Sequence, residues 1–199
     1  MGKVVCSMGV SVDGYTAGPN QSLDLPFGEG GLRESLTRWM FDAAEDNAEE
    51  IAAITDAGAT IMGRNMFGPP RGEPDQDWKG WWGPEPPYHN DVFVLTHHAR
   101  ESIPMAGGTT FHFVTSGIHE ALKWAREAAG ERNVAIAGGA ATVNQYLAAG
   151  LIDELRLHIV PLTLGAGTRL FEGVPPLKLE QVRSRPASLV THVTYRVLS

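Results

Sequence analysis

The sequence predicts an α/β fold with a mostly parallel sheet and an antiparallel edge. Short apolar runs alternate with segments of helical spacing through the first three quarters of the chain, and strand-like runs alone follow. Strands that alternate with helices form parallel pairs through crossovers, whereas consecutive strands pair as antiparallel hairpins. Because no repeat and no linker divides the 199 residues, we expect a single domain over 1–199.

The composition is that of an ordinary globular protein. Hydrophobic residues make up 43% and charged residues 20% of the chain, which excludes collagen, coiled coil and wholesale disorder. The net charge of −7 argues against partners such as nucleic acid or an anionic membrane. No apolar run approaches the ~18 residues of a membrane-spanning helix, and Cys6 has no second cysteine to pair with. We therefore expect a cytoplasmic protein.

The chain begins with a strand, a loop and a helical region. The apolar run at 3–10 predicts a buried strand, and the Gly, Pro, Asn and Asp content of 13–31 predicts a loop. Apolar residues then recur along one helical face: Leu32, Leu36, Trp39, Met40, Ala44, Ala48, Ile51 and Ala52. This spacing predicts a helical region over about 32–57 that breaks near Asp42 and is stopped by Gly58.

The middle of the chain contains one long irregular segment. A buried strand predicted at 59–62 leads into Gly63 and Arg64, after which residues 68–87 hold six prolines and show no period. A loop of this length within a compact domain is usually functional or disordered, and its three tryptophans, Trp78, Trp81 and Trp82, argue against disorder. Their rings could border a flat ligand, or pack on the domain or on a second subunit.

The remaining elements alternate until the terminal hairpin. They are strands at 92–95 and 110–114, a helix with its N-cap at Ser116, a strand at 134–137, a helix at 140–149 closed by Gly150, and a strand at 155–160. Segments 177–183 and 189–197 predict a hairpin around Arg185 and Pro186.

The first candidate site is the turn at Gly138-Gly139. A predicted strand delivers these two glycines directly to the start of a helix. Glycines let the backbone approach a ligand closely, and the helix start offers unpaired amides with partial positive charge, which suits a phosphate or pyrophosphate. The same pattern also occurs in a tight turn that binds nothing, and it is weaker than a full dinucleotide fingerprint, which the chain lacks.

The second candidate site is the Gly63-Arg64 turn at the end of another predicted strand. A guanidinium is always charged and binds phosphate through two parallel hydrogen bonds. Alone, the pair could equally be a surface arginine beside a turn. Together, the two turns predict a cradle for a pyrophosphate and a clamp for a further phosphate.

Other polar residues give weaker indications. Thr96 and His97 follow a predicted strand and could contact a nucleotide, although an ordinary polar turn would look the same. Asp13-Gly14 is most commonly a simple turn. The seven histidines lack the spacing of a zinc protease, and with one cysteine we expect no metal site.

Five segments together resemble a known family. They are residues 8–18 (MGVSVDGYTAG), 61–64 (IMGR), 136–140 (IAGGA), 151–155 (LIDEL) and 159–165 (IVPLTLG), the last followed by Leu170-Phe171. Their order and spacing resemble those of the dihydrofolate-reductase-like superfamily, and in particular the riboflavin-biosynthesis reductases that form the C-terminal domain of bacterial bifunctional deaminase–reductases. The resemblance covers nearly the whole chain.

The resemblance implies a central sheet of about eight strands, a homodimer, and an NADPH-dependent reductase that transfers hydride to a small heterocycle or ribosylaminopyrimidine. It also implies roles for individual residues. The expected cofactor-binding residues are Gly63, Arg64, Asn65, Thr96, His97, Gly138, Gly139, Ala140, Ala141 and Thr142. The expected residues beside nicotinamide and substrate are Ser11, Asp13 and Gly14.

Departures from the family keep other functions open. One cysteine is too few for the zinc deaminase half of the bifunctional enzymes. Asp13 is our candidate for the proton donor, and Trp81 and Trp82 are our candidates for an aromatic wall against the substrate. Asp42 lies roughly where dihydrofolate reductases carry a carboxylate, so the chain could be a true dihydrofolate reductase. A nucleotide-binding module without catalysis is the third possibility.

Overall fold

The molecule is built around one large sheet, and the computed structural model describes residues 2–29, 36–68 and 77–198. The strands of this sheet are β1 (Val4–Ser11), β3 (Ala59–Gly63), β4 (Asp91–Leu95), β5 (Ile103–Pro104), β6 (Thr110–Val114), β7 (Val134–Gly138), β8 (Glu154–Val160), β10 (Lys178–Ala187) and β11 (Val190–Leu198). A separate ribbon pairs β2 (Tyr15–Ala17) with β9 (Thr168–Arg169).

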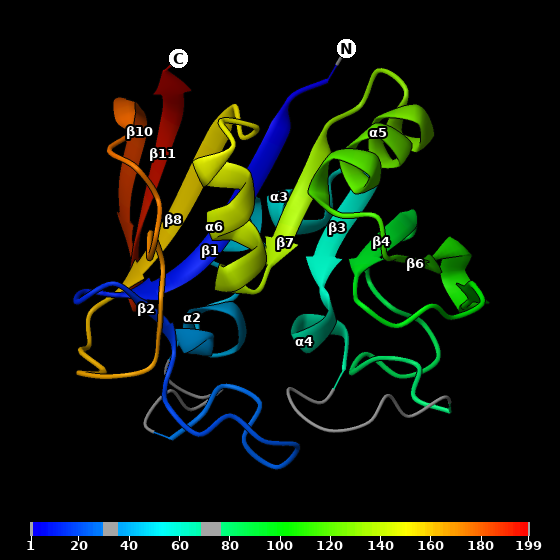
Figure 1. Ribbon diagram of the computed structural model, residues 1–199. Coiled ribbons are helices and arrows are strands. Elements are labelled where there is room, and N and C mark those ends of the chain that lie inside the picture. The colour runs from blue at the N-terminus through cyan, green and yellow to red at the C-terminus, as the bar shows by residue number, and fades with distance from the viewer. Residues whose placement is uncertain (1, 30–35, 69–76, 199) are drawn as a thin grey trace.

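The strand order of the nine-stranded sheet is β10-β11-β8-β1-β7-β3-β4-β6-β5 (Figure 1). The six strands from β8 to β6 are parallel to one another. The hairpin of β10 and β11 joins β8 in antiparallel fashion, and β5 is antiparallel to β6 at the other edge. The expected α/β class with a mostly parallel sheet and an antiparallel edge is therefore confirmed.

Helices cover both faces of the sheet. They are α2 (Arg38–Phe41), α3 (Ala48–Thr55), α4 (Arg64–Phe67), α5 (Ile118–Ala129) and α6 (Ala140–Ala148), with a short 3-10 turn at Ala106–Gly108. Figure 1 shows α5 and α6 on the near face and α3 behind the sheet. No helix in the described part of the chain has the length and apolar character needed to cross a membrane.

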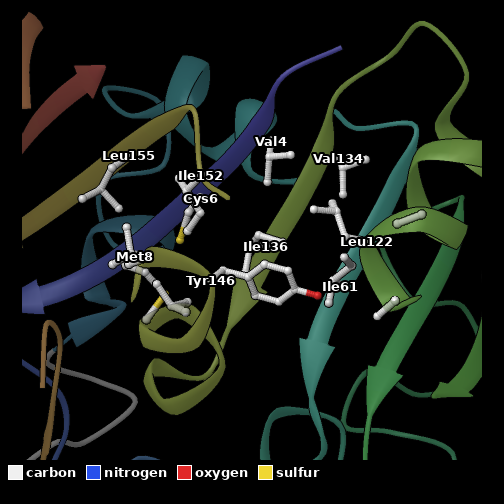
Figure 2. Close-up of a cluster of buried hydrophobic side chains, with 14 of the residues drawn as sticks. Val4, Cys6, Met8, Ile61, Leu122, Val134, Ile136, Tyr146, Ile152 and Leu155 are labelled. Carbon is white, nitrogen blue, oxygen red and sulfur yellow. The ribbon is translucent and has the colours of Figure 1, made fainter. Parts of the chain in front are cut away.

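The largest core cluster lies between the sheet and the pair α5 and α6. On β1, alternate residues such as Val4 and Cys6 point into it, because successive side chains of a strand face opposite sides. Tyr146 of α6 lies among them beside Ile136 (Figure 2). Its buried hydroxyl donates a hydrogen bond to the Ile118 carbonyl at 2.9 Å, which ties α6 to the start of α5.

Two smaller clusters cover the opposite face. One packs Leu36 and Trp39 against Val160 of β8. The other lies over β3, β4 and β6, where Trp82 stacks on Phe111 with ring centroids 5.9 Å apart. Short helices and aromatic loop residues, instead of long helices, thus cover this second face of the sheet.

The helical region predicted over about 32–57 is two short helices, α2 and α3, separated by turns near Asp42 as the sequence indicated. Its predicted beginning at Leu32 lies outside the described residues. Asn47 explains the separation, since its side-chain amide donates to the Ala43 carbonyl at 2.7 Å and holds the turn between the helices.

Two predicted boundaries are wrong. Helix α5 is capped by Gly117, not Ser116, because the chain enters it with φ of 90° at that residue, a conformation that favours glycine. The terminal hairpin turns at Ser188 and Leu189, since Pro186 still pairs with Thr191. Proline is tolerated there because β10 is an edge strand.

Candidate active site

The two predicted phosphate-binding turns lie at the same edge of the sheet. Strands β7 and β3 are parallel neighbours, and Met62 lies opposite Gly138 in their register. Strand β4 follows on the other side of β3, with Leu95 opposite Gly63. The structure therefore brings the turn at Gly138, the turn at Gly63 and the segment after Leu95 to adjacent positions.

The Gly138-Gly139 turn leaves the start of α6 open. Gly139 is the N-cap of α6, and among the described residues no side chain caps this helix end. The first bonded amides, those of Thr142 and Val143, return to the Gly139 carbonyl at 3.0 and 3.1 Å. The amides before them are free of intrahelical partners. A Cβ built at Gly139 would meet nothing within 4 Å, so the space in front of the helix dipole is open.

Gly138 has a different environment from its neighbour. It is buried, its φ is +126°, and its peptide bond to Gly139 is cis. A Cβ at Gly138 would lie 3.4 Å from the Met66 sulfur and 3.6 Å from the Met8 sulfur. These methionines, which the sequence analysis did not single out, line the turn from α4 and β1.

Gly63 allows β3 to approach α6 closely. A Cβ at this position would lie only 2.3 Å from the Thr142 hydroxyl oxygen, a contact that no folded protein tolerates without a shift. The two predicted turns are thus in direct contact through Gly63 and Thr142. The remaining predicted helix-start residues, Ala140 and Ala141, lie in the first turn of α6, the former buried and the latter exposed.

The polar residues after β3 and β4 form the far end of this edge. Arg64 begins α4, and its Nη1 donates to the Asn65 carboxamide oxygen at 3.4 Å. The Thr96 amide donates to Val114 at 3.1 Å, and its hydroxyl accepts from the amide of His98. His97 is exposed. A charged group, a hydroxyl and an imidazole therefore lie beyond the open glycine turn.

Strand β1 leaves β7 before its own end. The hydrogen-bonded register of the two strands stops at Cys6 and Ile136, whereas β1 continues to Ser11 alongside β8. The predicted substrate-side residues Ser11 and Gly14 lie at this extended end, next to the β2–β9 ribbon. They are separated from the glycine turn by the segment where the two strands part.

Asp13 is held by three hydrogen bonds. Its carboxylate accepts from the Ser11 hydroxyl at 2.6 Å and from the amides of Leu164 and Gly165 at 3.1 and 2.7 Å. The bond from Ser11, followed by those from the two amides, lowers its pKa to about 2. A carboxyl with this pKa is ionised at neutral pH and has no proton to donate. Its catalytic role stays a prediction, and its environment favours positioning of the 162–165 segment.

The β2–β9 ribbon, which follows the turn at Asp13 and Gly14, contains a cation–π pair that the sequence did not predict. The guanidinium of Arg169 lies over the ring of Tyr15, 4.8 Å from its centroid. Asn144 of α6 fixes the segment, because its amide donates to the Arg169 carbonyl and its oxygen accepts from the Phe171 amide. The contact joins two residues that are 154 positions apart in the sequence, so no local sequence pattern reveals it.

The predicted aromatic wall lies away from Ser11 and Gly14. Trp82 packs on Tyr88 and on Phe111 of β6, whereas Trp81 meets Trp78 edge to face. Strand β6 is four positions from β1 in the sheet, which corresponds to about 19 Å at ordinary strand spacing. Within this chain the two tryptophans are not brought to the extended end of β1, and their contact with substrate stays a prediction.

No group of three or more His, Cys, Asp or Glu in the described ranges is arranged to hold a metal ion. Asp42, the candidate for a dihydrofolate-reductase-type carboxylate, is about half exposed and pairs with Arg38 at 2.6 Å. It is therefore a surface residue at the end of α2 and not a buried acid.

Comparisons with known proteins agree with this architecture. A family model described as RibD C-terminal domain matches residues 2–193. None of the curated proteins matches the chain's sequence.

Three solved structures illustrate the similarity. A protein assigned to riboflavin biosynthesis from Shewanella sp. PV-4 is 22% identical with a TM-score of 0.67, and the match covers 99% of each chain. RibD from Acinetobacter baumannii is 18% identical with a TM-score of 0.61, covering 100% of this chain and 59% of that one. Dihydrofolate reductase from Enterococcus faecalis, complexed with NADP(H), is 16% identical with a TM-score of 0.57 and covers 99% of this chain and 97% of that one. At these identities the likeness establishes the fold.

Proposed function

Because the chain belongs to the RibD C-terminal domain family, we propose that it is an NADPH-dependent reductase. Its substrate is a small heterocycle of the ribosylaminopyrimidine type, as in 5-amino-6-(5-phosphoribosylamino)uracil reductases. The observation that carries the proposal is the open Gly138-Gly139 turn at the uncapped start of α6, in contact with the turn that bears Arg64.

The residues present fit the phosphates of NADPH. The free amides of Ala140 and Ala141 and the positive end of α6 suit a pyrophosphate, and the open space at Gly139 leaves room for it. Arg64 and Asn65 would hold the additional phosphate on the adenosine side. Thr96 and His97 would lie near the adenine-side ribose.

The extended end of β1 is suited to the reacting groups. When bound, NADPH supplies the hydride, and the protein supplies position and exclusion of water. Ser11 and Gly14 would border the nicotinamide and the substrate where β1 parts from β7. Asp13 would hold the 162–165 segment through the hydrogen bonds that it accepts from the amides of Leu164 and Gly165. The proton for the reduced atom would then come from water or from a more distant carboxylate.

One rival enzyme is less well supported. A dihydrofolate reductase would use a carboxylate beside the pteridine, but Asp42 is exposed and ion-paired. A module that binds nucleotide without turnover would use the same glycine turn, so kinetics must separate it from the reductase.

The proposal is tested by following NADPH oxidation with a panel of acceptors. The panel contains a phosphoribosylaminopyrimidine, its dephosphorylated form and dihydrofolate. We expect turnover with the pyrimidines and little with dihydrofolate. Fastest turnover with dihydrofolate would replace the proposed substrate class, and tight NADPH binding without turnover of any acceptor would contradict the proposed enzyme.

A further inference from the structure

The β2–β9 ribbon holds an exposed arginine beside the strand end that is proposed to border the substrate. Arg169 lies opposite Tyr15 in the antiparallel register of the two strands, so the two side chains lie on the same face of the ribbon. The amide of the next residue, Leu170, donates to the Gly14 carbonyl at 3.0 Å. The backbone of Arg169 is therefore next to the turn at Asp13 and Gly14.

Helix α6 also holds the backbone of this arginine. The Asn144 amide nitrogen donates to the Arg169 carbonyl at 3.1 Å, and the Asn144 oxygen accepts from the Phe171 amide at 2.9 Å. Asn144 lies in the second turn of the helix whose open start is at Gly139. Arg169 is thus fixed both to the substrate end of β1 and to the helix proposed to bind the cofactor.

The guanidinium of Arg169 is held against an aromatic ring. It lies 4.8 Å from the centroid of the Tyr15 ring, a distance at which cation–π attraction is favourable. The Tyr15 hydroxyl in turn donates to the Gly165 carbonyl at 3.4 Å. Tyr15 is partly buried, whereas Arg169 is exposed. The ring therefore restricts the guanidinium and leaves it open to a ligand from solvent.

Nearby acids do not take up this guanidinium in an ion pair. Among the residues that the structure describes, no carboxylate lies within 4.0 Å of it. The interaction with Tyr15 raises the pKa of Arg169 most, and the charges of Asp13 and Glu172 raise it further. The Asp13 carboxylate accepts the three hydrogen bonds described above. The guanidinium thus keeps N–H donors for an anion.

Phosphate is the anion that suits this group. A guanidinium presents its donors in a fixed fork that can bond two phosphate oxygens at once. The phosphates of NADPH are assigned to the start of α6 and to Arg64, which follows β3, two strands away from β1 in the sheet. Arg169 is on the substrate side, and the proposed substrate carries a phosphate of its own on the ribosyl group.

We propose that Arg169 binds the phosphate of the substrate and makes the enzyme select phosphorylated over dephosphorylated ribosylaminopyrimidines. Tyr15 is a positioning residue that holds the guanidinium in place. This inference rests on the proposed function and extends it from a substrate class to the group that is recognised.

Kinetics with the two pyrimidines test the selectivity. For the wild type we expect a higher kcat/KM with the phosphorylated form. Arg169→Ala should lower the ratio of the two kcat/KM values at least about tenfold, since charge-assisted hydrogen bonds are lost, while the Kd for NADPH is unchanged. The control is Arg196→Ala, which removes an exposed cation paired with Glu180. An unchanged ratio in Arg169→Ala would overturn the inference, and so would an equal loss of NADPH affinity, which would assign the arginine to the cofactor.

Two further variants separate charge from position. Arg169→Lys keeps the charge without the fork and should retain part of the selectivity. Tyr15→Leu removes the ring and should raise KM for the phosphorylated pyrimidine, with kcat for the dephosphorylated form unchanged. A Tyr15→Leu protein with equal losses for both pyrimidines would refute the positioning role.

Nuclear magnetic resonance of 15N-arginine-labelled protein tests the inference without turnover. Adding ribose 5-phosphate to the NADPH complex should shift the Nε resonance of Arg169, which Arg169→Lys identifies, and ribose should not. The resonance of Arg196 should stay in place. An Arg169 resonance that ribose 5-phosphate leaves unmoved, or an equal shift at Arg196, would overturn the proposal. Absence of turnover in the wild type with every acceptor would refute the proposed function, and this titration would then decide the inference by itself.

Discussion

Neighbouring glycines serve different purposes at the candidate cofactor site. Gly138 is buried and has a φ of +126°, so its lack of a side chain allows a backbone conformation that favours glycine. Gly139 has an ordinary φ of −72° and faces open space, so its lack of a side chain leaves room for a ligand. The sequence predicted the pair as one motif but could not separate the two roles, because backbone angles and open space are properties of the fold.

At Arg64, we expect the alanine variant to lose affinity for NADPH more than for NADH. A charge-assisted hydrogen bond to the extra phosphate contributes about 1.5–3 kcal/mol, which corresponds to roughly ten- to 150-fold in Kd. Titration calorimetry of both cofactors against wild type and Arg64→Ala measures the difference. The control is Arg132→Ala, which breaks an exposed pair with Asp56. Equal losses for NADPH and NADH would remove Arg64 from the phosphate site.

Among the elements, those with a clear local period were predicted and those without one were missed. The strand predicted at 155–160 and the helix predicted after Ser116 correspond to β8 and α5. Strands β2, β5 and β9 have two or three residues each, too few for any period. The terminal hairpin was found but its turn was misplaced, because proline normally marks a turn and here sits on an edge strand.

The close contact between β3 and α6 should make a substitution at Gly63 destabilising. Gly63→Ala places a methyl group 2.3 Å from the Thr142 hydroxyl oxygen. Overpacking of this kind costs about 1–3 kcal/mol, so the free energy of unfolding in urea should fall by that amount. Adding Thr142→Ala removes the clashing oxygen and should recover part of the loss. Additive losses in the double variant would show that the two residues are not in contact.

Two buried histidines, His158 of β8 and His192 of β11, should make the free energy of unfolding depend on pH. In the unfolded chain His158 and His192 titrate near 6.5, whereas their folded pKa values are lowered, that of His158 to about 3. Below pH 6.5 the unfolded state therefore binds more protons than the folded state. The contribution of the two histidines to the free energy of unfolding is fully present above that pH and is lost as the pH falls. From pH 7 to pH 5, His158 alone accounts for a loss of about 2 kcal/mol.

Urea unfolding of wild type and His158→Phe at several pH values measures this loss. The groups that face the pair are Glu50, Asp46, Arg156, Arg183 and Arg185. Arginines stay charged throughout this range, and the pKa values of both acids are lowered, so these groups change little between pH 7 and pH 5. A variant with the same pH dependence as wild type would contradict the assignment to the histidine pair.

In the whole molecule, the parallel order β1-β7-β3-β4 carries the predicted turns to one edge of the sheet. The sequence could predict the two glycine turns of the candidate cofactor site because each motif is local. In both, a strand ends at a glycine, which is followed by a helix at Gly139 and by an arginine at Gly63. It could not predict His158 with His192, or Tyr15 with Arg169, since each pair joins distant segments. The single domain and the homodimer stay predictions.

Sedimentation velocity tests the homodimer together with the predicted role of Trp81. We expect wild type and Trp81→Ala to sediment as dimers, and the variant to have a raised KM for the pyrimidine. Trp81 meets Trp78 edge to face at 4.7 Å, so its removal should leave the core intact. A shift to monomer with unchanged KM would assign the ring to a subunit interface instead.

The central claim is that NADPH binds in front of α6 at Gly139, and calorimetric titration of Gly139→Val with NADPH tests it most directly. The backbone angles at Gly139 are open to valine, and a Cβ there meets no protein atom within 4 Å, so the variant should fold with an unchanged melting temperature in the absence of cofactor. Its side chain would occupy the space that the pyrophosphate needs. We predict a folded variant with no measurable NADPH binding beside a wild type that binds. A folded Gly139→Val protein that binds NADPH as tightly as wild type would contradict the account.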